Sequence, residues 1–227
     1  MTNKMPIAIQ LTRRAAVGSA LAASIVALSG ASAFAQKAGG GKTVPVDALM
    51  KPGSLPDIVV GKADAPITIV EYASMTCGHC AHFHNTVFPE LKTKYIDIGK
   101  VRLIMREFPL DNLAAAASML TRCAGGDKTQ SLIKKFFADQ ESWAFVRGNP
   151  LPALLKVAES EGMTKEQFDK CLTDQKLLDG LTEGRDKASK EFGVNSTPTF
   201  FINGHRMEER SDQIAGFDKA LEPLLKK

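Results

Sequence analysis

Two cysteines, Cys77 and Cys80, stand three positions apart with Gly78 and His79 between them. At the start of a helix, residues at this spacing lie one turn apart, which is close enough for a disulfide. Free backbone N–H groups and the helix dipole favour a thiolate on Cys77 there, and His79 is expected to donate a hydrogen bond or positive charge to the same anion. The pattern therefore predicts a redox-active pair in which Cys77 attacks, Cys80 resolves and Gly78 leaves the sulfur accessible.

Other uses of a Cys-x-x-Cys pattern fit this sequence less well. A structural zinc site needs four nitrogen or sulfur ligands, and the sequence contains no second pair with this spacing. Haem attachment requires histidine directly after the second cysteine, where the sequence has Ala81. An inert disulfide that closes so short a loop would add little stability. We therefore predict no metal site, although a protein that binds a soft ion such as Cu(I) through Cys77, Cys80 and His79 stays open as an alternative.

The residues around the pair predict the elements that position it. Ile67–Ala73 is β-branched and almost entirely apolar, as expected for a buried central strand. A helix is predicted from Cys77 to about Tyr95, and Val101–Phe108 is predicted to be a second strand. The three elements form a strand-helix-strand unit, so the cysteines stand where its first strand passes into its helix.

The chain between residues 111 and 192 has apolar residues at helical spacing. Helices are predicted over Ala114–Cys123, Thr129–Gln140, Pro150–Glu161 and Lys165–Leu181. Strand character returns at Thr199–Ile202, and the following Asn203-Gly204 predicts a hairpin to a short strand near Arg206–Glu208. A last helix is predicted over Asp212–Leu225. The element order is therefore βαβ, a helical block and then ββα.

The N-terminus has the features of an export signal. Arg13-Arg14 precede an uncharged stretch of 22 residues, and Ala33-Phe34-Ala35 matches the small-x-small pattern of a signal-peptidase site. We therefore expect cleavage after Ala35 and a periplasmic mature protein, exported by the Sec or the twin-arginine route. An uncleaved anchor is the alternative, since the uncharged stretch is long enough to span a bilayer.

The charge argues against a nucleic-acid binder. The formal net charge of +4 comes largely from Lys4, Arg13 and Arg14, whereas residues 36–227 carry 26 basic and 25 acidic side chains. The sequence has no basic run with interleaved aromatic residues. Four cysteines in 227 residues are also too few for a disulfide-stapled scaffold, so the fold is expected to depend on its hydrophobic core.

Three separated segments resemble the DsbA-type oxidoreductases of the thioredoxin fold. Val70–Cys80 resembles the family's active-site region, Thr197–Gly204 its cis-proline loop and following strand, and Arg106–Leu110 the exit from its second strand into a helical insertion. The likeness spans about residues 58–227 and implies an α/β fold, in which a thioredoxin-like βαβ…ββα domain is interrupted by an all-helical insertion. The predicted parts are a signal peptide (1–35), a linker and lead-in (36–57), the first part of the thioredoxin-like domain (58–108), the helical insertion (109–192) and the second part of the domain (193–227).

The resemblance also implies roles for single residues. Pro198 would follow a cis peptide bond beside the cysteines, and the Thr197 backbone would bind an extended substrate peptide. A trans proline that opens a strand is the alternative. Glu71 would be buried beneath the pair and accept or deliver the proton of Cys80, with a solvent-facing acid as the alternative.

The other two cysteines lie in the helical block. Some members of the family carry a second, structural disulfide there, which implies a Cys123–Cys171 bridge. Its loop of about 50 residues would stabilise the fold by about 4 kcal/mol on a chain-entropy estimate. Two reduced core thiols are the alternative. The sequence offers no evident partner for His82, His84 or His205.

Together, the residues and the resemblance predict a periplasmic dithiol oxidase. A substrate thiolate would form a mixed disulfide with Cys77, and a second substrate cysteine would then release the protein with its pair reduced. No metal or nucleotide cofactor is expected, and a quinone-linked membrane partner would restore the disulfide. A disulfide isomerase or reductase of the same fold is the alternative. Only about 20 residues separate the predicted cleavage site from the first strand, which favours a monomer.

Overall fold

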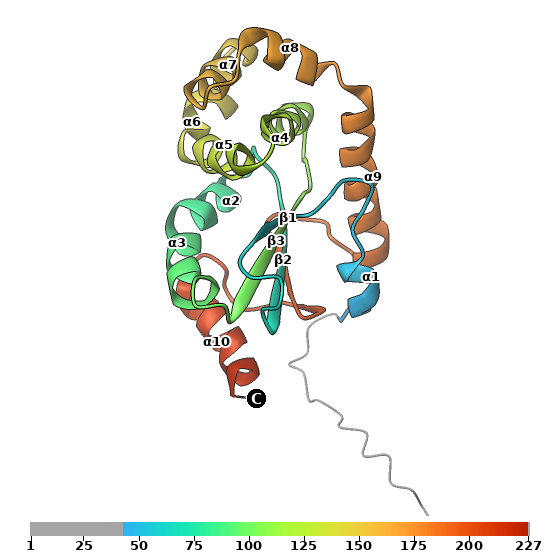
Figure 1. The fold of residues 1–227 in the computed structure, drawn as a ribbon, viewed down its shortest axis with the longest axis vertical. Coiled ribbons are helices and arrows are strands. Elements are labelled where there is room, and N and C mark those ends of the chain that lie inside the picture. Colours follow the sequence, from blue (N-terminus) through green and yellow to red (C-terminus); the bar gives the residue numbers. More distant parts are fainter. Residues whose placement is uncertain (1–42, 227) are drawn as a thin grey trace, which may run out of the picture. The chain divides into compact units, whose positions relative to one another are not determined.

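Five strands form one mixed sheet in the part of the chain that the computed structural model describes, residues 43–226 (Figure 1). The strands are β1 (Ile58–Val60), β2 (Ile67–Ala73), β3 (Val101–Glu107), β4 (Thr199–Ile202) and β5 (His205–Arg206). Their order across the sheet is β1-β3-β2-β4-β5, in which β2 and β3 are parallel and the other neighbours are antiparallel. The chain therefore leaves the central strand β2 directly into the helix that begins beside Cys77, which we call the cysteine helix.

The helix after β2 contains two wider, π-helical turns that the sequence pattern did not predict. Its parts are α2 (Gly78–His82), the π-helical turn η1 (Phe83–Val87), α3 (Phe88–Leu91) and the π-helical turn η2 (Lys92–Ile96). In a regular α-helix the ring of Pro89 would clash with the carbonyl of Asn85, and η1 widens the helix just before that proline.

The chain between β3 and β4 is helical. Its helices are α4 (Asn112–Ala124), α5 (Asp127–Ala138), α6 (Gln140–Ala144), α7 (Leu151–Ser160), α8 (Lys165–Leu172) and α9 (Gln175–Phe192). Two more helices flank the sheet elements, α1 (Val46–Met50) before β1 and α10 (Ile214–Leu225) after β5. In Figure 1, α4 to α8 gather at one end of the sheet, and α9 returns along it toward β4.

The sheet is buried on both faces, as a thioredoxin-like architecture requires. Alternate side chains of β2 enter two cores: Ile69 and Ala73 pack with the cysteine helix and α10, whereas Val70 and Tyr72 pack with α1 and α9. Every residue of β2 is buried, which explains its nearly continuous apolar sequence. The α/β fold with a helical insertion that the sequence implied is therefore the fold observed.

One predicted helix is two helices in the structure. The pattern predicted Lys165–Leu181 as a single helix, but α8 ends at Leu172 and α9 begins at Gln175. The carboxylate of Asp174 accepts a hydrogen bond from the Leu177 N–H at 3.0 Å, so it caps a new helix. The short helices α1 and α6 were not predicted, because five residues are too few to reveal a period.

The predicted hairpin is present with its second strand shifted. Asn203 and Gly204 both have positive φ, 47° and 84°, as a two-residue turn requires. This turn places β5 at His205–Arg206, directly after it, rather than at Arg206–Glu208. The predicted partner strand was therefore one residue late at its start.

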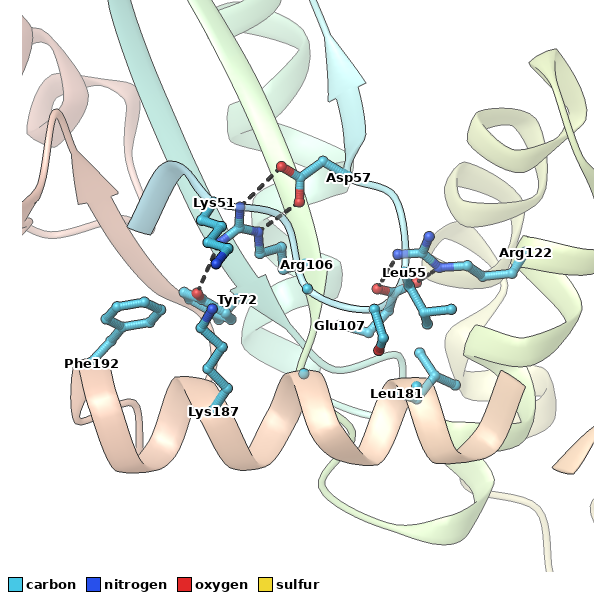
Figure 2. A pocket seen from close by; sticks show the side chains of 14 residues that line it. Lys51, Leu55, Asp57, Tyr72, Arg106, Glu107, Arg122, Leu181, Lys187 and Phe192 are labelled. Carbon is cyan, nitrogen blue, oxygen red and sulfur yellow. Dashed lines mark hydrogen bonds and ion pairs between the residues drawn. The ribbon is translucent and has the colours of Figure 1, made fainter. Parts of the chain in front are cut away.

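A cavity on the α9 side of the sheet holds a network of ion pairs (Figure 2). Arg106 on β3 donates two hydrogen bonds to Asp57, and Arg122 on α4 donates two to Glu107 at the end of β3. Neither active-site cysteine lines this cavity. The network fastens the segment between α1 and β1 to the sheet, and we give it a structural role.

The predicted signal peptide and most of the linker lie outside the described residues. Within residues 43–226, no helix combines the length and the apolar character that crossing a bilayer demands.

Candidate active site

Cys77 is the last residue before the helix, at its N-cap. The chain leaves β2 through a bend in which the Cys77 N–H donates to Ser74 O at 3.1 Å, and Cys77 O then accepts the Ala81 N–H at 3.0 Å. The side chains of both active-site cysteines are free thiols, and Cys77 is 9% exposed whereas Cys80 is fully buried. The sequence-based order of a reachable first sulfur and a shielded second sulfur is therefore present in the structure.

The surroundings of the two sulfurs separate their pKa values. A hydrogen bond from the Cys80 thiol is the main cause that lowers the pKa of Cys77 to about 5, and the backbone N–H groups of Cys80 and His79 lower it further. Burial raises the pKa of Cys80, and the nearby Glu71 carboxylate raises it as well. A thiolate is thus favoured on Cys77 and a thiol on the fully buried Cys80.

The Thr197–Pro198 loop lies against the pair. The peptide bond between these residues is cis, as the resemblance implied, and Cys77 Sγ donates a hydrogen bond to Thr197 O at 3.3 Å. The Thr197 hydroxyl is buried without a hydrogen-bond partner while Cys77 is a thiol. As a donor to the thiolate it contributes to the lowered pKa of Cys77.

His79 does not occupy the position expected from the sequence. Its side chain is exposed, and no hydrogen bond joins its ring to either sulfur in the part of the chain that the structure describes. What His79 gives to Cys77 is its backbone N–H, since the first turn of α2 points that group at the sulfur. Gly78 is exposed and open on the approach side, where an added Cβ would meet only the Gln140 side chain at 4.0 Å.

Glu71 is fully buried on β2, in agreement with the expectation of an acid beneath the pair. Because side chains alternate along a strand, it shares the face of Ile69 and Ala73, which packs against the cysteine helix. His84 Nε2 lies 3.1 and 3.0 Å from its two carboxylate oxygens. Sequence reasoning missed this partner, because His84 reaches β2 only once η1 has packed on the sheet.

Gln140 is a second residue that the sequence analysis missed. Its side-chain amide, 4% exposed, donates to the carbonyls of Met75 at 2.8 Å and Cys77 at 3.0 Å. Gln140 lies 63 residues along the chain from Cys77, in the short helix α6. The sequence carries no local signal for this role, because Gln140 stands among the polar residues Asp139, Glu141 and Ser142.

The helical insertion also touches the bend before Cys77 through Asp111. Its carboxylate accepts the Thr76 hydroxyl at 2.6 Å and the Ala114 N–H at 2.7 Å, so it caps α4 and holds the bend at once. Loop 74–76 is thus fixed from α4 and from α6.

Cys123 and Cys171 form the disulfide that the resemblance implied, between α4 and α8. Cys171 is buried, but Cys123 is exposed at the last turn of α4, which the sequence did not reveal. Among residues 43–226, no group of three or more histidine, cysteine or acidic side chains is arranged to hold a metal ion.

The comparisons with known proteins agree with this geometry. A family model described as thioredoxin matches residues 54–222. A Rickettsia bellii protein provisionally named as a protein-disulfide oxidoreductase is 37% identical over 168 residues, which are 73% of this chain and 65% of that relative. The chain thus spans less than two thirds of that relative's length. A Bacillus anthracis protein provisionally named disulfide bond formation protein D is 30% identical over 179 residues, which cover 74% of this chain and 78% of the relative.

Solved structures show the same likeness. The crystal structure of Wolbachia pipientis alpha-DsbA1 has a TM-score of 0.72 and 31% identity, over 80% of this chain and 96% of that chain. BdbD from Bacillus subtilis, at 20% identity and a TM-score of 0.67, shares the fold. The chain therefore belongs to the thioredoxin family, and within it to the DsbA-like thiol-disulfide oxidoreductases.

Proposed function

We propose that the protein is a dithiol oxidase that introduces disulfides into exported proteins. The observation that carries this proposal is the position of Cys77 at the N-cap of α2, above the fully buried Cys80 and against the cis Thr197–Pro198 loop. This environment lowers the pKa of Cys77 to about 5. A stabilised thiolate exists only in the reduced form, so it makes the Cys77–Cys80 disulfide a stronger oxidant. The same property makes Cys77 a good leaving group when a substrate disulfide forms.

The reaction would proceed by two exchanges. A substrate thiolate attacks Cys77 Sγ, the Cys77–Cys80 bond breaks, and its electron pair remains on Cys80, which takes up a proton. A second substrate thiolate then attacks the substrate sulfur of the mixed disulfide and expels Cys77 as a thiolate. The substrate gives up two electrons to the cysteine pair, which is the only redox group that the reaction needs.

The proposal includes the setting of the reaction. The signal-like N-terminus supports a periplasmic location, and reduced exported proteins are the proposed substrates. Since each turnover leaves Cys77 and Cys80 reduced, a membrane redox partner is proposed to return them to the disulfide. The same cysteine pair could serve an isomerase or a reductase. The reduction potential separates an oxidase from a reductase, and repair of a scrambled substrate separates it from an isomerase.

Equilibration of the protein with glutathione buffers, followed by acid quench and alkylation of free thiols, measures that potential. We expect a value above about −180 mV, the range of oxidants and isomerases. Rapid oxidation of a reduced, unfolded substrate with slow repair of a scrambled one is expected to accompany it. A potential near about −270 mV, the range of a thioredoxin, would instead assign a reductase.

A further inference from the structure

The pair of Glu71 and His84 extends from the interior of the fold toward its surface. Glu71 is fully buried, and the side chain of His84 is 8% exposed. The Nε2 atom of His84 lies within hydrogen-bond distance of both carboxylate oxygens of Glu71. Within residues 43–226 no hydrogen bond reaches the other ring nitrogen, Nδ1, and this atom keeps some solvent exposure.

Aromatic packing fixes the ring in this orientation. The His84 ring stacks on Phe137 of α5, with centroids 4.3 Å apart and an angle of 13° between the planes. The rings of Phe83 and Phe88 meet it at centroid distances of 5.1 and 5.5 Å. A histidine held in this way keeps Nε2 on Glu71 while Nδ1 stays at the surface.

Glu71 and His84 form a polar path from the surface toward Cys80. Glu71 lies on the face of β2 that packs against the cysteine helix, and its carboxylate contributes to the raised pKa of Cys80. The neighbours that the strand register and the aromatic contacts give for the pair are uncharged. They are Met105 on β3, Phe200 on β4, Phe88 on α3 and Phe137 on α5.

We propose that His84 relays protons between solvent and Glu71 each time Cys80 leaves or attacks during thiol-disulfide exchange. It is a positioning and relay residue that acts through Glu71 rather than a group that touches the reacting sulfurs. The two nitrogens of imidazole suit this role, because one can accept a proton while the other gives one up. The inference rests on the proposed exchange at Cys77.

The proton balance of the step is complete with these groups. When a substrate thiolate bonds to Cys77 Sγ, the Cys77–Cys80 bond breaks and its electron pair stays on Cys80 Sγ. The Glu71 carboxylate takes a proton from His84 Nε2 and passes it to Cys80, and His84 takes one from water at Nδ1. The protein thus absorbs one solvent proton, and the same proton leaves when Cys80 attacks to close the disulfide.

The test is the rate at which dithiothreitol reduces the oxidised protein, measured between about pH 5 and pH 8.5 by acid quench and alkylation and corrected for the thiolate fraction of the reductant. His84→Gln keeps an amide donor for Glu71 but cannot pass a proton on. We expect its corrected rate to fall by at least about tenfold, since general acid–base assistance contributes about 10²-fold or more. We also expect its pH profile to lose an inflection that the parent protein shows.

Chemical rescue separates a relay from a merely structural role. His84→Ala leaves a gap beside Phe137 that free imidazole can fill, so added imidazole is expected to restore the lost rate in this variant and to leave the parent protein unchanged. The matched control is His82→Gln. In the parent protein, His82 Nε2 lies 3.0 Å from Asp212 O rather than on Glu71. The exchange rate of His82→Gln is therefore expected to match that of the parent protein.

The outcomes distinguish this inference from the proposed function. If the parent protein exchanges with dithiothreitol while His84→Gln keeps its rate and pH profile, the relay is overturned and the proposed function stands. Absence of rescue in a folded, slow His84→Ala also overturns the relay. A parent protein that does not exchange at all would remove the proposed function itself.

Discussion

At the scale of single residues, the two active-site sulfurs differ because hydrogen-bond donors surround Cys77, whereas Cys80 is more deeply buried. The Cys80 thiol and nearby backbone N–H groups lower the pKa of Cys77 to about 5, whereas burial raises the pKa of Cys80. Near neutral pH the reduced pair therefore holds one thiolate and one thiol. The thiolate sits on the sulfur that substrates can reach, beside the exposed Gly78.

The peptide N–H of residue 79 is expected to matter more to Cys77 than the His79 imidazole does. His79→Ala keeps the N–H, so the pKa of Cys77 should change by less than about half a unit. His79→Pro removes the N–H in the first turn, where proline is tolerated, and should raise the pKa of Cys77 by about one unit. The reduction potential should then fall by about 30 mV, because the reduced form loses about 1.4 kcal/mol.

Ultraviolet absorbance of the thiolate against pH measures both pKa values. The sequence alone predicted that the ring would be the stabiliser, so that His79→Ala would raise the pKa of Cys77 and lower the potential. If His79→Ala changed the pKa of Cys77 more than His79→Pro, the imidazole ring would be the main stabiliser of the thiolate.

At the scale of elements, the short helix α6 supports the bend before Cys77. Gln140→Leu keeps the volume of the side chain but removes the donors to two buried carbonyls. We expect the free energy of unfolding to fall by about 1–3 kcal/mol, the cost of leaving buried polar groups unpaired. Urea unfolding checks this, with the exposed neighbour Glu141→Leu as a control that should change little. Equal stability of the two variants would contradict the role of Gln140.

The Cys123–Cys171 bridge joins α4 to α8 across 48 positions of the sequence. Replacement of both cysteines by alanine is expected to lower the free energy of unfolding by up to about 4 kcal/mol, because the unfolded chain regains the freedom of that loop. Denaturation of parent and variant with the Cys77–Cys80 pair in the same redox state isolates the effect. An unchanged unfolding midpoint would mean that the bridge contributes nothing.

Elements with a local signal could be predicted from the sequence, and contacts between remote segments could not. The buried strand β2 and the Asn203-Gly204 turn could be predicted from residue types alone. The redox-active pair could be predicted from the spacing of Cys77 and Cys80. In the sequence, His84 is indistinguishable from an ordinary histidine in a helix. Its contact with Glu71 forms only when η1 packs on β2. Gln140 likewise gains its role only when the insertion folds back on the cysteine bend. The missing information is the packing of one element on another.

At the scale of the whole molecule, the reduced form should gain stability as pH rises. The pKa of Cys77 is about 5 when folded and about 8.5 when unfolded. Between these values the unfolded chain binds one proton more, so the free energy of unfolding rises with pH by up to about 1.4 kcal/mol per unit. The contribution is fully present above the unfolded value and is lost as pH falls through about 5.

Urea unfolding of both redox forms at about pH 5, 6 and 7 measures this linkage. The oxidised form carries no titrating thiol at Cys77, so its stability should lack the slope and serves as the control. Parallel stability curves for the two forms would contradict a lowered pKa of Cys77.

The position of the helical insertion sets the order in which a growing chain can complete its sheet. β2 meets β3 after one helix, but its other neighbour, β4, is synthesised only after six further helices. A nascent chain that stops before residue 197 therefore has an unpaired edge on β2, open to pairing with other strands. It also presents Cys77 and Cys80 without the Thr197 carbonyl, and Cys123 emerges well before its partner Cys171. Synthesis from one end thus exposes three thiols to wrong pairing before the correct partner of Cys123 exists.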